Sequence, residues 1–277
     1  MVQEFNWKTK DGIKIYGSDW SIENPKAVVC LVHGLGEHCR RYDHLAEYFN
    51  QRKYAVTAYD RRGHGLSEGK RGHSPNLDAF LDEISELLNQ AKKKYPKIPV
   101  FLYGHSMGGN LVLNYVLRKK PNIIGTITTG AWIKVAIKTP KILLALSKVI
   151  RFIYPAMTFS NKLDGSLISS IDEEARKYEQ DPLVHANITA STAVEMLAAA
   201  KTLDEYNGPF PTPLLMMHGA SDPVIDPISS SKFVKQVSGD IEHQEFRGLH
   251  EIHYEAVRSQ VFDRTIEWMD ARLNKMS

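Results

Sequence analysis

Cysteine, excess charge of one sign and a long N-terminal apolar run are scarce or missing in this chain of 277 residues. Its two cysteines, Cys30 and Cys39, exclude a small secreted fold held together by disulfides. A formal net charge of +3 argues against a nucleic-acid partner, which would favour a strongly basic surface. No apolar signal region is visible near the start of the sequence, so we expect a cytoplasmic protein.

Sequence signatures of cofactor and metal sites are missing as well. No group of histidines and cysteines has the spacing of zinc ligands. No Gly-x-Gly-x-x-Gly pattern opens a helix, and no phosphate-binding P-loop occurs. We therefore predict no cofactor and no metal.

What the chain does contain is an alternation of apolar runs and amphipathic segments. Hydrophobic residues make up 43% of it, and we expect a single domain over residues 1–277. Residues 2–20, with Asp11 and Gly12 between two short runs, predict a β-hairpin. Further strand-like runs lie at residues 27–32, 54–60, 100–104, 123–129, 213–218 and 243–246. The helical spacing between them predicts an α/β fold with a mostly parallel central sheet and helices on both faces.

The alternation stops over residues 133–196, which we predict to be a helical cap inserted into the domain. A helix is expected over residues 141–153. No acidic residue occurs in residues 131–157, although five basic ones do. That pattern is typical of a partly buried helix with solvated lysines, and also of a cap whose apolar face touches a membrane or lipid particle. Thr192 and Glu195 have capping-box spacing and predict that another helix opens there.

The sharpest chemical signal follows the strand-like run at residues 100–104. Residues 104–108 have the pattern Gly-x-Ser-x-Gly, centred on Ser106. Gly104 and Gly108 remove the Cβ atoms that would prevent a strand from reversing tightly into a helix. Such a turn exposes the serine hydroxyl at the carboxyl end of the sheet. The structural alternative is a glycine-rich turn with an incidental serine, but the strand-turn-helix context favours a nucleophile.

A serine nucleophile requires a histidine base that a carboxylate holds in one tautomer. In this kind of fold the acid and then the histidine follow the serine, each in a loop after a strand. Asp222 and His250 occupy such positions, with Asp226 and His253 as their nearest competitors. Asp226 is better placed to cap a helix, and His250 is nearer to the end of its strand. We therefore predict a catalytic triad of Ser106, Asp222 and His250.

Attack on an ester places negative charge on the carbonyl oxygen, and backbone N–H groups directed at that oxygen lower the barrier. One donor should be the N–H of Met107, directly after the nucleophile. The second should come from the glycine-rich loop at residues 33–36, with Leu35 N–H as the expected donor. His33 is expected to stabilise that loop. The alternative for the loop is a simple glycine turn.

Five segments together resemble the monoacylglycerol lipase and lysophospholipase-like group of α/β-hydrolases, of the serine aminopeptidase S33 type. They are residues 33–38 (HGLGEH), 60–67 (DRRGHGLS), 104–109 (GHSMGG), 178–185 (YEQDPLVH) and 250–253 (HEIH). The resemblance implies the α/β-hydrolase fold, the same triad and the same two oxyanion donors. It also implies a polar pocket end for the glycerol part of a substrate, lined by Glu37, Arg41, Tyr178 and His253.

These observations predict a serine hydrolase that cleaves monoacylglycerols to fatty acid and glycerol through an acyl-enzyme. The alternatives are a lysophospholipase or broad carboxylesterase, a peptidase or C–C bond hydrolase, and a catalytically inactive protein that binds a ligand. A complete set of triad candidates weighs against the inactive protein. The resemblance also implies that the cap forms an apolar tunnel for the acyl chain and contacts membranes peripherally.

Overall fold

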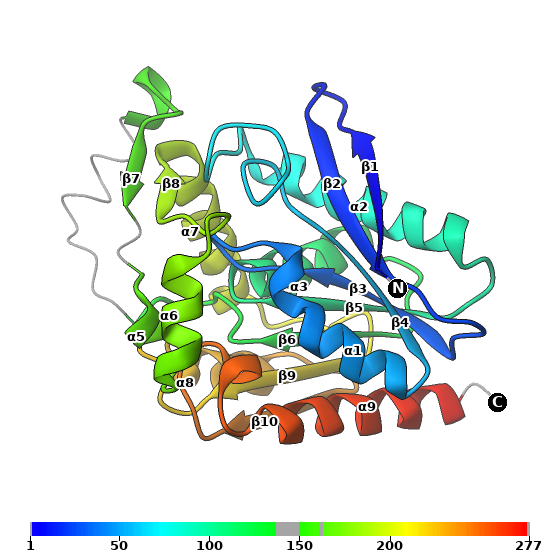
Figure 1. The fold of residues 1–277 in the computed structure, drawn as a ribbon. Helices are drawn as coiled ribbons and strands as arrows, with labels where there is room; N and C mark the ends of the chain where they lie inside the picture. The colour runs from blue at the N-terminus through cyan, green and yellow to red at the C-terminus, as the bar shows by residue number, and fades with distance from the viewer. Residues whose placement is uncertain (1, 137–149, 161–162, 276–277) are drawn as a thin grey trace.

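Parallel strands form the centre of one large sheet, and an antiparallel hairpin lies at its edge (Figure 1). The computed structural model describes residues 2–136, 150–160 and 163–275. In spatial order the sheet contains β1 (Val2–Lys8), β2 (Lys14–Trp20), β4 (Tyr54–Tyr59), β3 (Ala27–Val32), β5 (Val100–His105), β6 (Gly125–Thr129), β9 (Leu214–Gly219) and β10 (Ile241–Phe246). β2 pairs antiparallel with β1 and β4, and the other neighbouring strands pair parallel. The predicted α/β fold with a mostly parallel sheet is confirmed.

The strands at the centre of the sheet are continuous apolar runs because helices cover both of its faces. Every residue of β3, β4 and β5 is buried, as expected for strands without a solvated face. The predicted hairpin is also present, and its Gly12 has a φ of 86°, a conformation that favours glycine.

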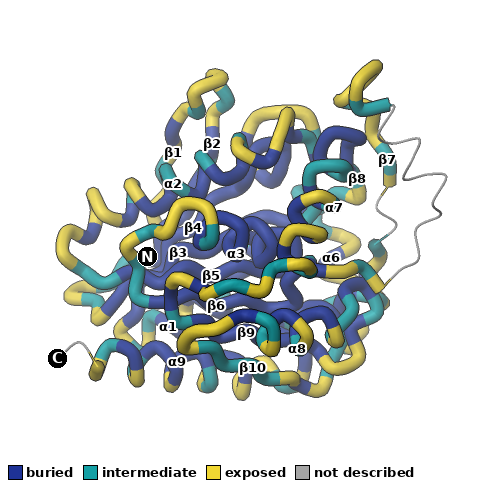
Figure 2. The backbone as a smooth tube through the Cα atoms, turned by 180° about the vertical axis from the view of Figure 1, so that it is seen from behind, coloured by how far each residue is buried: buried dark blue, intermediate teal, exposed yellow. Residues whose placement is uncertain are grey.

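Two hydrophobic cores lie on the two faces of this sheet. Helices α1 and α9 pack on one face, and α2, α3, α7 and α8 pack on the other (Figure 1). Their bounds are α1 (Asp43–Gln51), α2 (Leu77–Lys94), α3 (Met107–Lys119), α7 (Ala190–Glu205), α8 (Pro227–Gln236) and α9 (Arg258–Asn274). In Figure 2 the central strands are dark blue throughout, which shows how completely these helices remove the sheet from water.

The sheet register brings distant loops to a single edge. Val32, Gly104, Thr128 and Met216 lie side by side across four neighbouring parallel strands. Because these strands are parallel, the loops that follow them all leave at the same edge. The residues after β3, β5, β6, β9 and β10 therefore meet there, although they are far apart in the sequence.

Between β6 and α7 the described residues leave the sheet and form a separate layer over this edge (Figure 1). This layer contains helices α5 (Gly165–Ile168) and α6 (Asp172–Gln180) and two short antiparallel strands, β7 (Thr158–Ser160) and β8 (Asn187–Thr189). The segment ends in α7, which packs against α3. The two strands were not predicted. Their three-residue length is too short to give a readable alternation.

Two sequence-based expectations concern helices of this segment. Of the helix expected over residues 141–153, residues 150–153 are helical and the others lie outside the described residues. The predicted start of α7 at Thr192 is wrong. The helix begins at Ala190, and Thr189 is its N-cap because the Thr189 side chain accepts from the Thr192 amide. Glu195 instead accepts from the backbone N–H of Leu77 at 2.9 Å, so its carboxylate joins two helices and does not complete a capping box.

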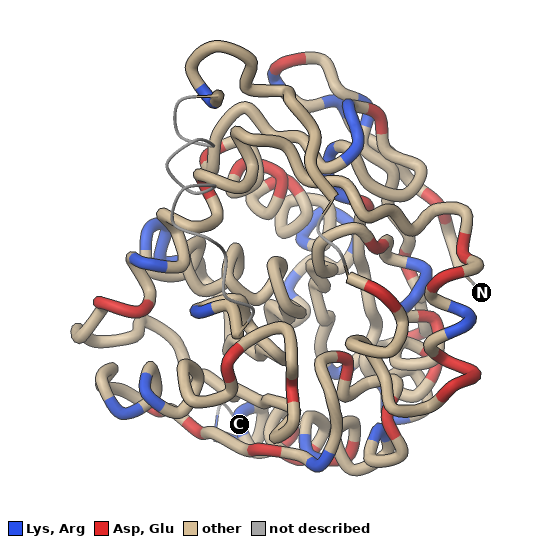
Figure 3. The backbone as a smooth tube through the Cα atoms, turned by 90° about the vertical axis from the view of Figure 1, so that its left-hand side faces the viewer, with Lys and Arg blue, Asp and Glu red and all other residues tan. Residues whose placement is uncertain are grey.

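The surface carries basic and acidic residues interspersed along the backbone, as the view in Figure 3 shows. Among the residues that the structure describes, no helix combines the length and the apolar character that a membrane span requires. The single-domain boundaries and the cap boundaries at residues 133–196 stay predictions.

Candidate active site

Ser106 lies at a sharp turn between β5 and α3. Its φ of 53° and ψ of −118° are unusual for a residue other than glycine. The backbone around it fixes this conformation, since the Ser106 N–H donates to Thr129 O at 2.9 Å and its carbonyl accepts from Trp132 N at 3.0 Å. The strained backbone is therefore imposed by hydrogen bonds from the next strand and from the loop that follows it.

The two glycines of the motif are required by close backbone packing. A Cβ on Gly104 would lie 2.5 Å from the carbonyl oxygen of Gly108. A Cβ on Gly108 would lie 2.1 Å from the carbonyl oxygen of Val32 in β3. Only glycine fits at either position, so α3 can pack directly against the strands that carry the turn.

The structure brings Ser106, His250 and Asp222 into one hydrogen-bonded chain. The Nε2 atom of His250 lies 2.8 Å from Ser106 Oγ, and its Nδ1 atom lies 2.7 Å from Asp222 Oδ2. The carboxylate keeps the imidazole proton on Nδ1 and leaves Nε2 free to accept the serine proton. His250 comes from the loop after β10 and Asp222 from the loop after β9, as the sequence order predicts.

The Asp222 carboxylate stabilises the charged form of His250 relative to a buried histidine without such a partner. Burial lowers the pKa of His250, but the adjacent Asp222 carboxylate outweighs burial and raises this pKa above its ordinary value of 6.5. For the carboxylate the effect of burial has the opposite sign, because burial alone would raise the pKa of Asp222. The neighbouring His250 and His218 outweigh burial and hold this pKa well below its usual range. Asp222 is therefore ionised throughout the physiological pH range.

Asp222 is held by more partners than the sequence suggested. Its Oδ1 atom accepts from the backbone N–H groups of Val224 at 2.8 Å and Ile225 at 3.0 Å. Its Oδ2 atom lies 3.0 Å from Nε2 of His218, whose Nδ1 atom lies 2.7 Å from Ser230 Oγ. Sequence reasoning missed His218. The signal was available, because His218 ends a buried strand four residues before the acid.

The two competing residues have other roles. Asp226 is the N-cap of α8, where its Oδ1 atom accepts from Ile228 N at 3.0 Å. His253 lies beneath the site, with Nε2 at 2.9 Å from both Tyr103 Oη and Thr129 Oγ1. Of these four candidates, Asp222 and His250 are the two that form the hydrogen-bonded chain to Ser106.

The two predicted oxyanion donors lie on either side of the serine. Met107 is the first residue of α3, so its N–H has no acceptor within the helix. Leu35 lies in the loop after β3, and this loop packs closely on the turn. A Cβ on Gly34 would lie 3.2 Å from the Cβ of Ser106. Among the described residues, neither the Leu35 N–H nor the Met107 N–H has a hydrogen-bond acceptor. Their roles as oxyanion donors stay predictions.

A second buried polar group surrounds Arg41. Its guanidinium lies 2.5 Å from Glu251 Oε2 and 3.3 Å from Glu37 Oε2. It is also stacked between the rings of Tyr178 from α6, in the predicted cap, and Tyr254 from the loop after β10, at 4.8 and 4.7 Å from their centroids. Arg41 therefore joins the cap to the floor of the site through charge and ring stacking.

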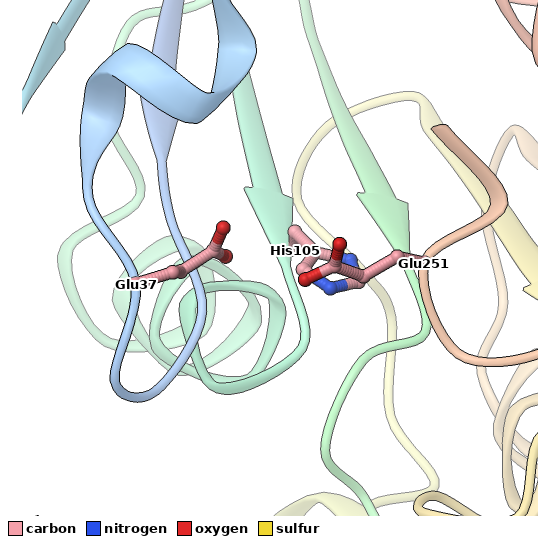
Figure 4. A group of neighbouring side chains, drawn as sticks. All are labelled: Glu37, His105 and Glu251. Atoms are coloured by element: carbon pink, nitrogen blue, oxygen red, sulfur yellow. The ribbon is translucent and has the colours of Figure 1, made fainter. Parts of the chain in front are cut away.

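Glu37, His105 and Glu251 point toward one another (Figure 4). One potential ligand atom of each lies within 4.8 Å of the others, a spacing that could suit a metal ion. Arg41 already pairs with both carboxylates, so the group contains its own cation. Burial and the neighbouring Glu37 carboxylate raise the pKa of Glu251 to about 7, although Arg41 opposes the shift.

Three of the four predicted pocket residues come together in this group, and the fourth does not. Glu37, Arg41 and Tyr178 are adjacent, whereas the ring of His253 is fully buried against Tyr103 and His105. A role for His253 in lining the pocket stays a prediction of the resemblance. Sequence reasoning assigned no role to Glu251, although a carboxylate directly after the predicted base was a visible signal.

The fold and the serine–histidine–aspartate chain define a serine hydrolase of the α/β-hydrolase class. Comparison with known proteins supports this class. A family model described as "Serine aminopeptidase, S33" matches residues 23–256, and the chain belongs to this family. The members of this family are serine hydrolases. Two of the three similar proteins described next are monoacylglycerol lipases.

Three similar proteins illustrate the relationship. A monoacylglycerol lipase of Mycolicibacterium smegmatis is 31% identical over 266 residues, which cover 95% of each chain. An uncharacterised abhydrolase domain-containing protein of Dictyostelium discoideum is 36% identical over 253 residues, but these span 90% of this chain and only 27% of that protein. The crystal structure of the Paleococcus ferrophilus monoacylglycerol lipase has a TM-score of 0.82 and 30% identity, and the match covers 93% of this chain and 99% of that one.

Proposed function

We propose that this protein is a monoacylglycerol lipase, in which Ser106 is the nucleophile, His250 the general base and acid, and Asp222 the residue that orients His250. The observation that carries the proposal is the continuous chain from Ser106 Oγ through His250 to Asp222, with contacts of 2.8 and 2.7 Å. The similarity to two monoacylglycerol lipases over almost the whole chain supports the substrate class.

The proposed reaction has two halves. Ser106 Oγ attacks the ester carbonyl carbon while His250 Nε2 takes its proton, and the carbonyl π electrons move to the oxygen. The resulting oxyanion is bound by the N–H groups of Leu35 and Met107. When the oxyanion collapses, the bond to the glycerol oxygen breaks and His250 returns the proton to that oxygen, which leaves an acyl group on Ser106.

Water completes the cycle by the same route. His250 removes a proton from the water as its oxygen attacks the acyl carbon. The second oxyanion collapses, the bond to Ser106 Oγ breaks, and His250 protonates Oγ. The products are a fatty acid and a regenerated enzyme. Asp222 stays ionised and stabilises the imidazolium in both halves.

Arg41 and its neighbours form the proposed polar end of the pocket. Glu37 and Glu251 supply acceptors and Arg41 supplies donors, a combination suited to the two free hydroxyl groups of a monoacylglycerol. Glu37 also accepts from Tyr42 Oη at 2.9 Å, so its carboxylate is held in place before any substrate binds. A glyceryl ester should therefore gain binding over a simple alkyl ester.

A substrate panel tests the proposal. The wild-type protein and Ser106→Ala are assayed on monoacylglycerols, lysophospholipids and short soluble esters over a series of acyl lengths. We expect the highest kcat/KM on long-chain monoacylglycerols and no turnover by Ser106→Ala. A maximum on lysophospholipids, or on short esters with monoacylglycerols left intact, would replace the proposal with the lysophospholipase or carboxylesterase alternative.

We also propose that the cap contacts lipid surfaces peripherally. Phe152 and Ile153 are 87% and 80% exposed, and Tyr154 and Met157 beside them are exposed as well. Exposed apolar side chains gathered on one segment favour insertion at the level of lipid headgroups. A cytoplasmic location is consistent with this proposal and stays a prediction of the sequence.

Sedimentation with phosphatidylcholine vesicles tests this contact. The double variant Phe152→Ser and Ile153→Ser should bind vesicles at least roughly tenfold more weakly than the wild type, because each side chain loses favourable burial in lipid. A matched variant at another exposed apolar residue, Ile228→Ser in α8, should bind normally. Equal binding by the double variant and the wild type would exclude Phe152 and Ile153 as the residues that contact lipid.

A further inference from the structure

Arg61 is a buried cation that the reaction described above does not use. Its side chain has no exposed surface, and its Nε and Nη1 atoms have no hydrogen-bond partner among the described residues. No carboxylate of the described residues lies within ion-pair distance of it. The nearby Glu83 pairs with Arg62 instead, at 2.5 Å. A poorly paired buried guanidinium is unfavourable for folding, so stability alone does not explain this residue.

The hydrogen bonds of Arg61 converge on one carbonyl group in the loop after β3. Its Nη2 atom donates to the carbonyl oxygen of Gly34. The same oxygen lies 2.8 Å from Nδ1 of His33. The backbone N–H of Arg61 donates to Nε2 of His33 at 3.0 Å. Arg61 therefore contacts the Gly34 carbonyl directly through its side chain. Its backbone N–H also binds His33, the second residue that contacts this carbonyl.

The tautomer of His33 follows from these contacts. Burial and the nearby Arg61 charge hold the pKa of His33 well below its ordinary value, so the ring is neutral. Since Nε2 accepts from a backbone N–H, the ring proton is on Nδ1 and is donated to Gly34 O. The 3.5 Å approach of Arg61 Nη2 to His33 Nδ1 then joins two donors and is not a hydrogen bond. Two donors, one of them charged, thus share the Gly34 oxygen.

The Gly34 carbonyl belongs to the same peptide group as the Leu35 N–H. Donors on a peptide oxygen draw electron density toward it and make the N–H at the other end a stronger donor. They also fix the plane of the peptide. The preceding peptide is fixed too, because the Gly34 N–H donates to Glu37 Oε1. Through its hydrogen bond to the carbonyl end of this peptide, Arg61 therefore influences both the direction and the polarity of the Leu35 N–H.

We propose that Arg61 is a positioning residue of the oxyanion hole, whose guanidinium orients and polarises the Gly34–Leu35 peptide. The Leu35 N–H then binds the developing oxyanion more strongly than it binds the neutral ester carbonyl. The effect falls on the transition state, so it raises kcat and leaves KM nearly unchanged. The inference rests on the proposed function only for the step in which Ser106 attacks an ester.

The test compares two neighbouring buried arginines. Arg61→Met removes the donor to Gly34. Arg62→Met is the matched control, because Arg62 is also buried but pairs with Glu83 at 2.5 Å and Asp11 at 2.8 Å on the other side of the loop. Each variant is assayed for kcat and KM on p-nitrophenyl butyrate and on a monoacylglycerol. Affinity for a trifluoromethyl ketone, which forms a tetrahedral oxyanion with the serine, and the melting temperature are measured alongside.

Loss of an oxyanion donor costs about 10²- to 10³-fold in kcat, so weakening one should cost about tenfold. We expect that fall in kcat for Arg61→Met, with KM within about twofold and an equal fall in trifluoromethyl ketone affinity. Arg62→Met should keep its kcat even if it melts earlier. The proposal is overturned if Arg61→Met keeps its kcat and ketone affinity, or if both variants lose kcat in proportion to their loss of stability.

A second variant covers poor folding of Arg61→Met. Arg61→Lys keeps a charge but lacks the guanidinium fork, and its kcat and ketone affinity should fall several-fold at an unchanged KM. Wild-type values for Arg61→Lys would overturn the proposal equally. The soluble ester separates the two ideas. If monoacylglycerols are not substrates, the proposed function fails, while the comparison on p-nitrophenyl butyrate still decides the role of Arg61.

Discussion

The edge of the sheet that carries Ser106 is buried, whereas the tip of the predicted cap, residues 152–157, is exposed to solvent. At the sheet edge every reactive group is buried and fixed, and Asp222 alone has contacts with two histidine rings and two backbone N–H groups. At the cap tip, Phe152 and Ile153 are almost fully exposed. A reactive group needs a defined position, and buried hydrogen bonds supply it. Exposed apolar side chains do not stabilise the folded chain, because their surface stays in contact with water. They are suited to contact with a lipid surface.

The base of the predicted cap, residues 170–181, differs from its tip because hydrogen bonds and ring stacking hold it against the site. Tyr178 stacks on Arg41, and Asp181 lies 2.8 Å from Nε2 of His38. Ser170 Oγ donates to Glu255 at 2.5 Å. The cap therefore has one end that shares the order of the active site and one end that faces solvent. The following substitutions test this contrast.

The largest effect should come from Ser106→Ala, which removes the proposed nucleophile. We expect turnover of every ester substrate to fall by roughly a million-fold, the scale seen when a triad serine is removed. The melting temperature should change little, because the strained turn is held by backbone hydrogen bonds that alanine keeps. The cap-tip substitutions Phe152→Ser and Ile153→Ser should leave turnover of a soluble ester unchanged. Residual turnover by Ser106→Ala near the wild-type rate would mean that another nucleophile acts.

The next largest effect should separate the two aspartates. Asp222→Asn should lower kcat by about 10⁴-fold, because an amide no longer holds His250 in the required tautomer. Asp226→Asn is the matched control, and it should lose at most about 1 kcal/mol of stability at the N-terminus of α8 with kcat unchanged. Kinetics and chemical unfolding of both variants provide the measurement. A large fall in kcat for Asp226→Asn with a near-normal Asp222→Asn would reverse the assignment.

A third comparison uses two tyrosines of the cap. Tyr178 at its base is 5% exposed, whereas Tyr154 at its tip is 57% exposed. Tyr178→Ala should lower the free energy of unfolding by about 3 kcal/mol, since it leaves a cavity and unstacks Arg41. Tyr154→Ala should change it by less than about 0.5 kcal/mol. Urea unfolding of both variants checks this, and similar losses would mean that base and tip are equally ordered.

The smallest predicted effect is on the pH dependence of the wild type. In the proposed mechanism neutral His250 is the base, so kcat/KM should fall about tenfold per pH unit as the pH drops below the His250 pKa. Because Asp222 raises this pKa above 6.5, the loss should begin at a higher pH than for an isolated histidine. The profile is measured with a soluble ester, together with a folding control at each pH.

Glu251 provides the necessary control for this profile, because its pKa of about 7 falls in the same range. The acid limb should persist in Glu251→Gln if His250 governs it. Its disappearance in that variant would assign the limb to the carboxylate beside Arg41.

Much of the fold could be predicted from the sequence because its signals are local. The Asp11-Gly12 turn, the apolar run before Ser106 and the small residues around it each depend on a few adjacent residues. Where a local signal had a competitor, the prediction was less secure. Thr192 and Glu195 fit a capping box, but Thr189 caps the helix, and Glu195 instead accepts from a backbone N–H at the start of α2.

Sequence reasoning assigned no role to His218, Glu251 or Arg61. His218 contacts Asp222, which is only four residues away, so its role had a local signal. Glu251 and Arg61 instead contact partners that are distant in the sequence. Glu251 meets Arg41 across 210 residues, and Arg61 meets Gly34 across 27. Such pairs are created by the parallel register that brings the loops together.

The sequence by itself determined where strands turn into helices and which residue types stand at those turns, because sterics and hydrogen bonding act between neighbours. It thereby also determined the order of the proposed nucleophile, acid and base along the chain. Only the tertiary structure decided which histidine faces the hydroxyl, what holds the acid and what lies behind the oxyanion loop. Ser106 and His250 are 144 residues apart, and a contact across that distance exists only once the sheet has aligned its strands.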